Sequence, residues 1–494
     1  MRIFFSYDLP YAGEVEYAFR ILCSCIACDL ITNETAESYD SPNTIVVSYG
    51  PNIPRRIHRR HLHIFSDPSF WHNFRKLESL PREPIGQFSL QDLRLRSNEK
   101  LQDPLICPYY RAGEDSSIVR WEKCGTENCS VLVCNIDLIA STFFWITRYE
   151  EMFFQERDEY GRVPEDRLLC VRENCFSRPL VDEYGEALFQ LLSQFGIPVQ
   201  STQESFRVSI THDVDSGIPV KGGNEYFEYG LRSLYREIFR ERRFRAGLSD
   251  CFQWCAIGQG KRSYAYVFSQ IVKLDQTYGF TSYFFIMANG THPKDSQSNI
   301  FSEYSRRVIH EIKSTGGQIG LHLGINSHSS PIQFRREWSN IREVVPNALS
   351  ASRAHYLIFH VPHTWKTLSE IGCRVDSTLG FSKYMGFRAG TSRPFRPFDI
   401  LNSCVILLWE YPMMIMDKNL FVMRVRSDRD RIERALQIVD KVIAHRGCLV
   451  INWHNMYFFS DYLRMYKEIL AYLAKRGKDV RLEAAPEPDD KLIW

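Results

Sequence analysis

The chain has 494 residues and a formal net charge of +2, and 44% of its residues are hydrophobic. This length is too great for one ordinary core and suggests two or three domains, while the hydrophobic content excludes an intrinsically disordered chain. The small net charge gives no reason to expect a nucleic-acid partner. No stretch approaches the roughly 18 uncharged apolar residues that a membrane span needs.

Two further features bear on the compartment. Residues 1–8, MRIFFSYD, reach polar and acidic residues too soon for a secretory signal. The 14 cysteines lie in apolar segments without the spacing of a disulfide framework. We interpret even Cys23, Cys25 and Cys28, in a predicted helix, as buried apolar side chains rather than as a metal cluster. We therefore expect a cytoplasmic protein with reduced thiols and no membrane span.

The first 200 residues are typical of a mixed α/β domain. The spacing of their apolar residues predicts helices over residues 15–30, 137–154 and 181–195, and strands over 43–48 and 130–134. We therefore predict a smaller α/β N-terminal domain over residues 1–200.

From residue 205 onward, strands and helices alternate. The predicted strands are 206–211, 280–286, 318–323, 352–357, 448–452 and 479–482, and the predicted helices are 264–278, 303–314, 365–371, 431–445 and 461–476. Recurrent strand–helix units predict a parallel sheet, closed as a barrel or open. In either arrangement, catalytic residues gather where the strands end. We therefore predict a second, catalytic domain over residues 205–494.

The first of these strands ends in two carboxylates. Residues two apart share a face of a strand, so Asp213 and Asp215 lie together if the chain stays extended. Two buried carboxylates repel each other unless a cation or a shared proton compensates. By the same alternation, His322 lies opposite the apolar residues of its own strand. An imidazole added to the carboxylates would form an O/N site for zinc, manganese or iron.

Two later strands end in residues of the same kind. Arg353 and His355 share a face over residues 352–357, and Asn452 and His454 share a face after 448–452. A metal among these groups would polarise a carbonyl and acidify a bound water, with a carboxylate as base and an imidazole as acid. The residues therefore predict hydrolysis of an amide or an ester.

The order of these motifs resembles the NodB-like polysaccharide deacetylases, carbohydrate esterase family 4. The similarity covers about residues 205–494 and follows the order Thr211-His212-Asp213-Val214-Asp215, Gly320-Leu321-His322, Arg353-Ala354-His355, Val375-Asp376-Ser377-Thr378-Leu379-Gly380 and Asn452-Trp453-His454. The run from Gly386 to Thr391 resembles a segment of one bacterial branch. Residues 137–151 and 178–182 resemble an uncharacterised bacterial domain that precedes such deacetylase domains. The resemblance implies a distorted (β/α) barrel and a bacterial origin.

The resemblance also implies roles for individual residues. Asp213 corresponds to the base, Asp215 and His322 to metal ligands, Arg353 to the residue that orients the base, and His454 to the general acid. In the family the two aspartates are adjacent, whereas Val214 separates them here, so their roles could be exchanged. Asp376 either supports the site or ends its strand. His212, His360 and His363 are interpreted as structural.

One position departs from the family pattern. The family's second motif has two histidines four residues apart, but the second position here is Asn326. The missing ligand could be Asn326 itself, His328 from the loop, or His355 from the neighbouring strand. We favour His355, because it shares a face with Arg353 and needs no loop rearrangement.

We therefore expect a metal-dependent hydrolase acting on a non-peptide carbon–nitrogen bond. Its expected reaction removes acetyl from an N-acetylated sugar or from a polysaccharide or glycolipid precursor, so the expected partner is a carbohydrate substrate. Zinc is the first expectation for the divalent metal, with manganese, cobalt, nickel and iron as alternatives. Two other functions stay open: hydrolysis of another small amide on the same fold, and a catalytically inactive carbohydrate-binding or scaffold protein, which Asn326 would favour.

Overall fold

The fold is described from a computed structural model of the chain. It describes residues 1–32, 43–111, 118–124, 129–215, 265–296, 299–422, 427–458 and 461–479, with isolated positions between 230 and 255. Residue 264 of one predicted helix and residues 480–482 of the last predicted strand lie outside these ranges. In the described part of the chain, every helix is too short or too polar to cross a membrane.

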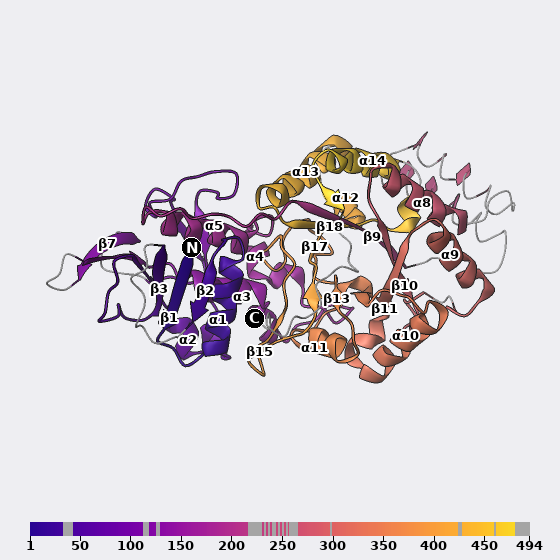
Figure 1. The fold of residues 1–494 in the computed structure, drawn as a ribbon. Coiled ribbons are helices and arrows are strands. Elements are labelled where there is room, and N and C mark those ends of the chain that lie inside the picture. The colour runs from indigo at the N-terminus through magenta and orange to yellow at the C-terminus, as the bar shows by residue number, and fades with distance from the viewer. Residues whose placement is uncertain are drawn as a thin grey trace.

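The first part of the chain is built on a six-stranded sheet with the order β2-β1-β3-β4-β8-β7, parallel except for β7 (Figure 1). Its strands are β1 (Arg2–Tyr7), β2 (Asp29–Thr32), β3 (Thr44–Gly50), β4 (His61–Phe65), β7 (Val119–Cys124) and β8 (Cys129–Cys134). The helices α1 (Ala12–Cys23), α3 (Leu138–Ile146) and α5 (Leu180–Ser193) pack against one another. Their buried apolar side chains belong to the same core cluster as those of the sheet.

Two helices of this part end earlier than predicted. The helix expected over residues 15–30 ends at Cys23, and Asp29–Thr32 instead forms β2, because the chain there pairs in parallel with β1. The helix expected over 137–154 ends at Ile146. Arg148 has a left-handed backbone with φ 56°, which ends the helical path before a 3-10 turn at Tyr149–Met152. At β2, pairing with β1 overrides local helix propensity.

The second part of the chain is built on a larger sheet in which every strand pair is parallel. The order along the sheet is β16-β13-β12-β11-β10-β9-β18-β17, and β19 also pairs with β9. The strands are β9 (Arg207–Val214), β10 (Ser282–Met287), β11 (Gln318–Leu323), β12 (Ala351–Ala354), β13 (Val375–Asp376), β16 (Trp409–Glu410), β17 (Met413–Met416), β18 (Cys448–Asn452) and β19 (Lys478–Asp479). The path runs from β16 to β17 without closing, so the sheet is an open, curved barrel.

Helices lie on the outside of this sheet (Figure 1). They are α8 (Ala265–Thr277), α9 (Glu303–Ser314), α10 (Pro331–Val344), α11 (His363–Glu370), α12 (Asp417–Val422), α13 (Asp428–Ala444) and α14 (Asp461–Ala474). The predicted fold class is confirmed: the protein is mixed α/β, with a distorted, open (β/α) barrel in its second part and a smaller α/β unit before it.

One predicted strand of the barrel is too long. The strand expected over residues 352–357 ends at Ala354, and His355–Leu357 form a 3-10 turn. Tyr356 and Leu357 have φ angles of 55° and 56°. These left-handed conformations turn the chain away from the sheet. His355 therefore enters the site from a turn and not from a strand.

The two parts of the chain share buried polar contacts. The Glu151 carboxylate accepts hydrogen bonds from Arg148 at 2.8 Å and from Arg388 at 3.0 Å, and all three side chains are at most 3% exposed. The Asp182 carboxylate accepts from the Thr391 hydroxyl at 2.6 Å and from the Ser392 amide at 2.8 Å. Residues 388–392 of the second part are therefore held by helix α5 and the 3-10 turn after α3.

Candidate active site

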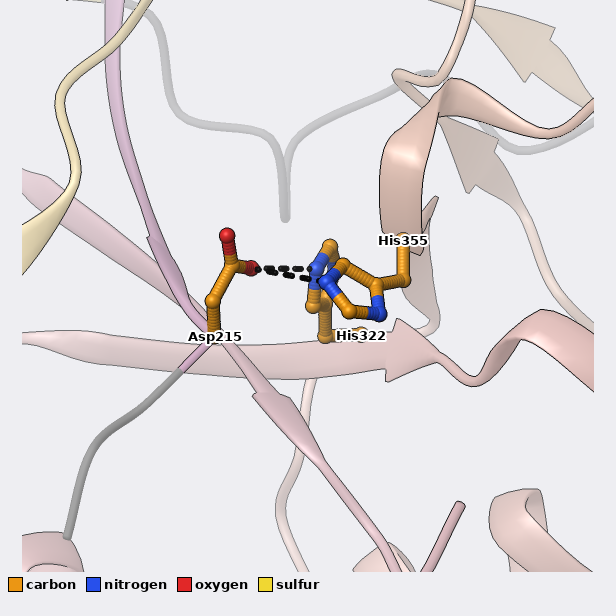
Figure 2. Close-up of side chains that lie close together, drawn as sticks. All are labelled: Asp215, His322 and His355. Carbon is orange, nitrogen blue, oxygen red and sulfur yellow. Dashed lines mark hydrogen bonds and ion pairs between the residues drawn. The ribbon is translucent and has the colours of Figure 1, made fainter. Parts of the chain in front are cut away.

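Asp215 lies at the centre of the candidate site, directly after strand β9. Its Oδ1 lies 3.0 Å from Nε2 of His322 and 3.7 Å from Nε2 of His355 (Figure 2). Its Oδ2 lies 3.3 Å from Nε2 of His454. The two histidines at Oδ1 come from the end of β11 and from the turn after β12, which are neighbours in the sheet.

Asp215, His322 and His355 form a group that could hold a metal ion. One ligand atom from each residue lies within 4.8 Å of the others. One carboxylate oxygen and two imidazole nitrogens are the donor set of many catalytic zinc sites, where a water takes the fourth position. Both histidines are buried, whereas the Asp215 side chain is 29% exposed. The residues therefore fit a divalent metal with one side open to a ligand.

The rings of both histidines are held by their second nitrogen. Nδ1 of His322 lies 3.0 Å from the backbone oxygen of Arg353, and Nδ1 of His355 lies 3.0 Å from Oδ1 of Asp295. When Nδ1 donates to these oxygens, Nε2 of the neutral ring is the nitrogen whose lone pair a metal could take. Such outer partners orient metal-binding histidines in general. Asp295 was not predicted, because it lies in the loop after β10 outside any regular pattern.

Replacing Asp295 by asparagine is expected to weaken metal binding. The neutral amide accepts a weaker hydrogen bond than a carboxylate, and loss of such an outer partner typically costs roughly 10- to 100-fold in metal affinity. Competition with a chromophoric chelator measures the zinc affinity. Asp399→Asn is the matched control, because Asp399 also caps backbone amides, at Leu401 and Asn402, but lies in β14 (Phe398–Asp399). Equal zinc affinity of the Asp295 variant and the wild-type protein would contradict this role.

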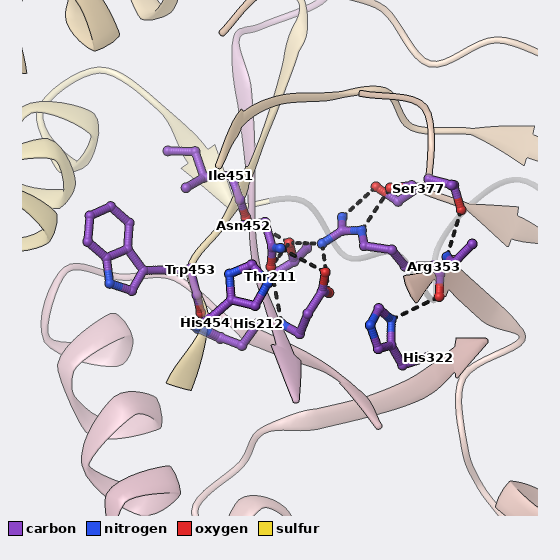
Figure 3. A network of polar contacts seen from close by, with 12 residues as sticks. Thr211, His212, His322, Arg353, Ser377, Ile451, Asn452, Trp453 and His454 are labelled. Carbon is purple, nitrogen blue, oxygen red and sulfur yellow. Dashed lines mark hydrogen bonds and ion pairs between the residues drawn. The ribbon is translucent and has the colours of Figure 1, made fainter. Parts of the chain in front are cut away.

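Asp213 lies beside this group and forms hydrogen bonds with Arg353 and Asn452, whose side chains are labelled in Figure 3. Its Oδ1 accepts from Arg353 at 3.1 Å and its Oδ2 from the Asn452 amide at 2.8 Å. The same arginine donates to Thr211 at 2.6 Å and to the Ser377 backbone oxygen at 2.8 Å. Because each Asp213 oxygen has its own donor, the carboxylate is fixed in position and charge-compensated without a metal.

His454 completes the site from the end of β18. Its Nδ1 lies 2.8 Å from Oδ1 of Asp417, whose other oxygen accepts from the His454 backbone amide. Asp417 was not predicted, although it directly follows the apolar strand β17 as Asp215 follows β9. The pair has the geometry of a histidine oriented by a buried carboxylate.

The pKa values of the site reflect its mixture of charges. Burial opposes the charge on Asp215, but His454 and the hydrogen bond from His322 outweigh it and hold the pKa of this carboxyl well below its usual range. Burial likewise opposes the charge on His454, but Asp417 and Asp215 raise its pKa well above the usual value. The pKa of His322 is raised against burial by Asp213 and Asp215. The site therefore favours an anionic Asp215 beside imidazolium groups in the absence of metal.

These groups face a cavity of about 50 Å³. Besides the five side chains Asp213, Asp215, His322, His355 and His454, its lining consists of Arg162, Tyr356, Leu357, Ser382, Met416 and Lys418. Arg162 belongs to the first part of the chain and donates to the Tyr356 backbone oxygen at 2.8 Å. The ring of Tyr160 stacks on the ring of Tyr356 with centroids 4.2 Å apart. A loop of the first part therefore forms one side of the cavity.

The other candidates for the missing ligand lie elsewhere. Asn326 is half-buried and donates to Thr291 at 3.0 Å. His328 hydrogen-bonds to the backbone oxygen of Ile325 and stacks on His360, with ring centroids 4.9 Å apart. Of the three residues considered, His355 is the one that the fold brings to Asp215 and His322.

Two further residues of the predicted motifs face away from the cavity. His212 is buried between the Trp453 backbone oxygen and Asp275 on α8, at 2.7 Å and 2.9 Å. This placement agrees with the strand alternation that set it opposite Asp213. Asp376 accepts from Ser352 at 2.8 Å and, like His212, is not part of the cavity lining.

Comparisons with known proteins give one family model, described as a family of unknown function, DUF7033, which matches residues 9–196. No curated protein sequence matches the chain. The match lies within the part that was expected to resemble an uncharacterised domain. It covers less than half of the chain and leaves the candidate site outside it.

Several solved structures have a similar fold. A candidate polysaccharide deacetylase from Mycobacterium smegmatis is 15% identical over 56% of this chain and 87% of its own, with a TM-score of 0.36. The chitin deacetylase of the fungal pathogen Colletotrichum lindemuthianum is 12% identical over 60% and 94%, with a TM-score of 0.31. The carbohydrate deacetylase Agd3 is 7% identical over 98% and 86%, with a TM-score of 0.37. Likeness at this level concerns the fold and assigns no activity.

Proposed function

We propose that the protein is a metal-dependent hydrolase that removes acetyl from an N-acetylated sugar. One observation carries this proposal. The candidate metal ligands Asp215, His322 and His355 share a small cavity with two further side chains. These are the Asp213 carboxylate, fixed by hydrogen bonds from Arg353 and Asn452, and the His454 imidazole, fixed by Asp417. Metal, base and acid are the parts that amide hydrolysis needs, and here they meet at the ends of parallel strands.

The geometry favours Asp213 as the base and Asp215 as the ligand. Asp215 contacts three imidazoles, and its side chain is partly exposed to the cavity, as a metal ligand with an open coordination position requires. Both oxygens of Asp213, in contrast, accept hydrogen bonds, from Arg353 and Asn452. A divalent metal at Asp215 would polarise the acetyl carbonyl and lower the pKa of a bound water. Asp213 would accept the proton of that water, with Arg353 keeping the carboxylate in place.

His454 would act as the acid. Its Nδ1 is engaged by Asp417, so the proton it can deliver is the one on Nε2, which faces the cavity. Asp417 raises the pKa of His454 and so favours the protonated ring that an acid needs. Transfer to the leaving nitrogen breaks the carbon–nitrogen bond, with acetate and the free amine as products.

The size of the cavity and its entrance suit this substrate class. A space of about 50 Å³ accepts a short acyl group such as acetyl and leaves the rest of the substrate outside. Tyr356 lines the cavity with a half-buried ring, and the apolar face of a sugar can pack on such a ring. The ordered motifs resemble those of sugar deacetylases, and this supports a carbohydrate over another amide.

Replacing His454 by glutamine is expected to lower kcat by roughly 10²- to 10⁴-fold, the usual contribution of one acid or base. Zinc binding should persist, because Asp215, His322 and His355 are intact. Turnover and zinc content of the same preparation provide the measurement. His310→Gln, on the exposed side of α9, is the control and should behave like the wild-type protein. Loss of zinc in the His454 variant would make His454 a ligand rather than the acid.

The proposed function is tested by measuring acetate release from a panel of compounds with the zinc-loaded protein. We expect acetate from N-acetylglucosamine oligosaccharides and little from acetanilide. Release from acetanilide alone would indicate a hydrolase of small amides. Binding of the oligosaccharides without acetate release from any compound would indicate a binding protein and contradict the proposal.

A further inference from the structure

A second cavity, of about 390 Å³, lies between the two parts of the chain. Its lining comes from helices α1 and α5, from residues 391–411, and from Arg207 at the start of β9. Asp213 lies six residues further along β9, so at about 3.3 Å per residue the two ends are roughly 20 Å apart. This cleft is therefore separate from the candidate active site, and nothing in the proposed hydrolysis uses it.

The cleft has the size and walls of a small-molecule site. Its volume falls within the range of about 300–1,000 Å³ that is typical of ligand pockets, which occur preferentially at junctions between domains. The walls are mainly apolar and aromatic, with Ile21, Leu22, Val181, Phe395, Trp409 and Tyr411 among them. A flat or narrow apolar body would bury its surface against these side chains.

The polar part of the lining is positively charged. Four arginines, Arg20, Arg207, Arg393 and Arg396, face two acids, Asp182 and Glu204. The Asp182 carboxylate is already occupied by Thr391 and by the amide and hydroxyl of Ser392.

Glu204, the other acid, pairs with Arg393. The charge of Arg207 is thus not matched by either acid that lines the cleft.

Arg207 forms no ion pair among the described residues. Its Nε is buried and, within the described chain, has no hydrogen-bond partner. A buried donor without a partner is costly, and the cost is greater for a charged group. The guanidinium is planar and well suited to bind carboxylate, sulfonate or phosphate oxygens. Because Arg207 lines an apolar cleft, a ligand with an anionic group on an apolar body could pair with the guanidinium and also contact the apolar side chains of the lining.

We propose that this cleft binds a small organic anion: an aromatic or aliphatic body in contact with the apolar walls and one acidic group at Arg207. The site is distinct from the metal group, and binding there does not require hydrolytic activity. The proposal is therefore independent of the proposed function.

The fluorescent anion 8-anilinonaphthalene-1-sulfonate is a suitable probe, because it joins a sulfonate to an aromatic body. Titration of the full-length folded protein should show saturable binding at one site. Arg207→Gln should weaken this binding roughly 10- to 100-fold, the value of a hydrogen bond to a charged group. The exposed Arg335 gives the matched control, Arg335→Gln, with unchanged binding. N-Phenyl-1-naphthylamine, which lacks the sulfonate, should bind wild-type and Arg207→Gln protein equally.

A second variant tests the cleft by filling it. Val405 lies in the lining and is partly exposed, so Val405→Trp adds bulk there with little disturbance of the core. Circular dichroism and thermal unfolding verify that each variant is folded before titration. Loss of dye binding in Val405→Trp supports the site. Dye affinity unchanged in both Arg207→Gln and Val405→Trp, or the absence of saturable binding to the wild-type protein, would overturn the proposal.

Discussion

Replacing Asp215 by asparagine is expected to remove both metal binding and turnover. The carboxylate is the one anionic ligand of the group and has two histidines at its Oδ1. Asparagine has nearly the same shape but no charge, so zinc would face two neutral imidazoles and a weak amide oxygen. We expect zinc affinity to fall by more than roughly 100-fold, which exceeds the effect expected when a hydrogen-bond partner of a ligand, such as Asp295, is replaced. Turnover should fall by at least about 10³-fold, because a water without the metal does not ionise near neutral pH.

Asp213→Asn provides the matched comparison, because it removes the other carboxylate of the same strand. We expect this variant to keep its zinc and to lose roughly 10²- to 10⁴-fold in kcat, as for loss of a general base. Elemental analysis and acetate release on both variants distinguish the two roles. Loss of zinc in Asp213→Asn with zinc retained in Asp215→Asn would show that the two aspartates have exchanged roles. Zinc and activity retained in Asp215→Asn would refute the site assignment.

Replacing Glu151 by alanine is expected to cost about 3–5 kcal/mol of unfolding free energy. Glu151 is 2% exposed and lies between two arginines, Arg148 and Arg388, which are 1% and 3% exposed. Burial opposes its charge, but Arg388 and Arg148 hold the pKa of Glu151 below its usual range. Without the carboxylate, two buried guanidinium groups would lose their shared anion. Loss of these ion pairs would weaken the contact between the two parts of the chain, because Arg148 belongs to the first part and Arg388 to the second.

Urea unfolding followed by circular dichroism measures this cost. Glu433→Ala is the matched control, because Glu433 also pairs with an arginine, Arg429, but both side chains are more than half exposed. Such surface pairs contribute about 0–1 kcal/mol. A Glu151→Ala variant within about 1 kcal/mol of the wild-type protein would contradict the proposed role of the buried network.

The sequence predicted the parts of the site that depend on strand alternation. Asp213 and His212 face opposite sides of β9, and His322, near the end of β11, lines the same cavity as Asp213. Period-two alternation is a local property of the backbone, so it can be read without knowledge of the fold. The parallel sheet then brings the ends of these strands together.

The remaining parts of the site depend on tertiary structure. His355 lies beside Asp215 and His322, but it enters from a 3-10 turn with left-handed residues and not from the predicted strand. Asp295 and Arg162 come from loops, where neither periodicity nor a motif marks them. Asp417 could have been predicted, because it directly follows an apolar strand as Asp215 does. Contacts between distant loops are set by how the elements pack, and one sequence carries little signal of that.

The central claim is that a metal at Asp215, His322 and His355 drives hydrolysis of an N-acetyl group. The most direct measurement removes the metal with a chelator and then follows acetate release from an N-acetylglucosamine oligosaccharide while zinc is added back. We expect the stripped protein to be inactive and the rate to rise in proportion to zinc until one equivalent per chain is bound. A rate that is unchanged by stripping, or no acetate release at any zinc concentration, would contradict the account.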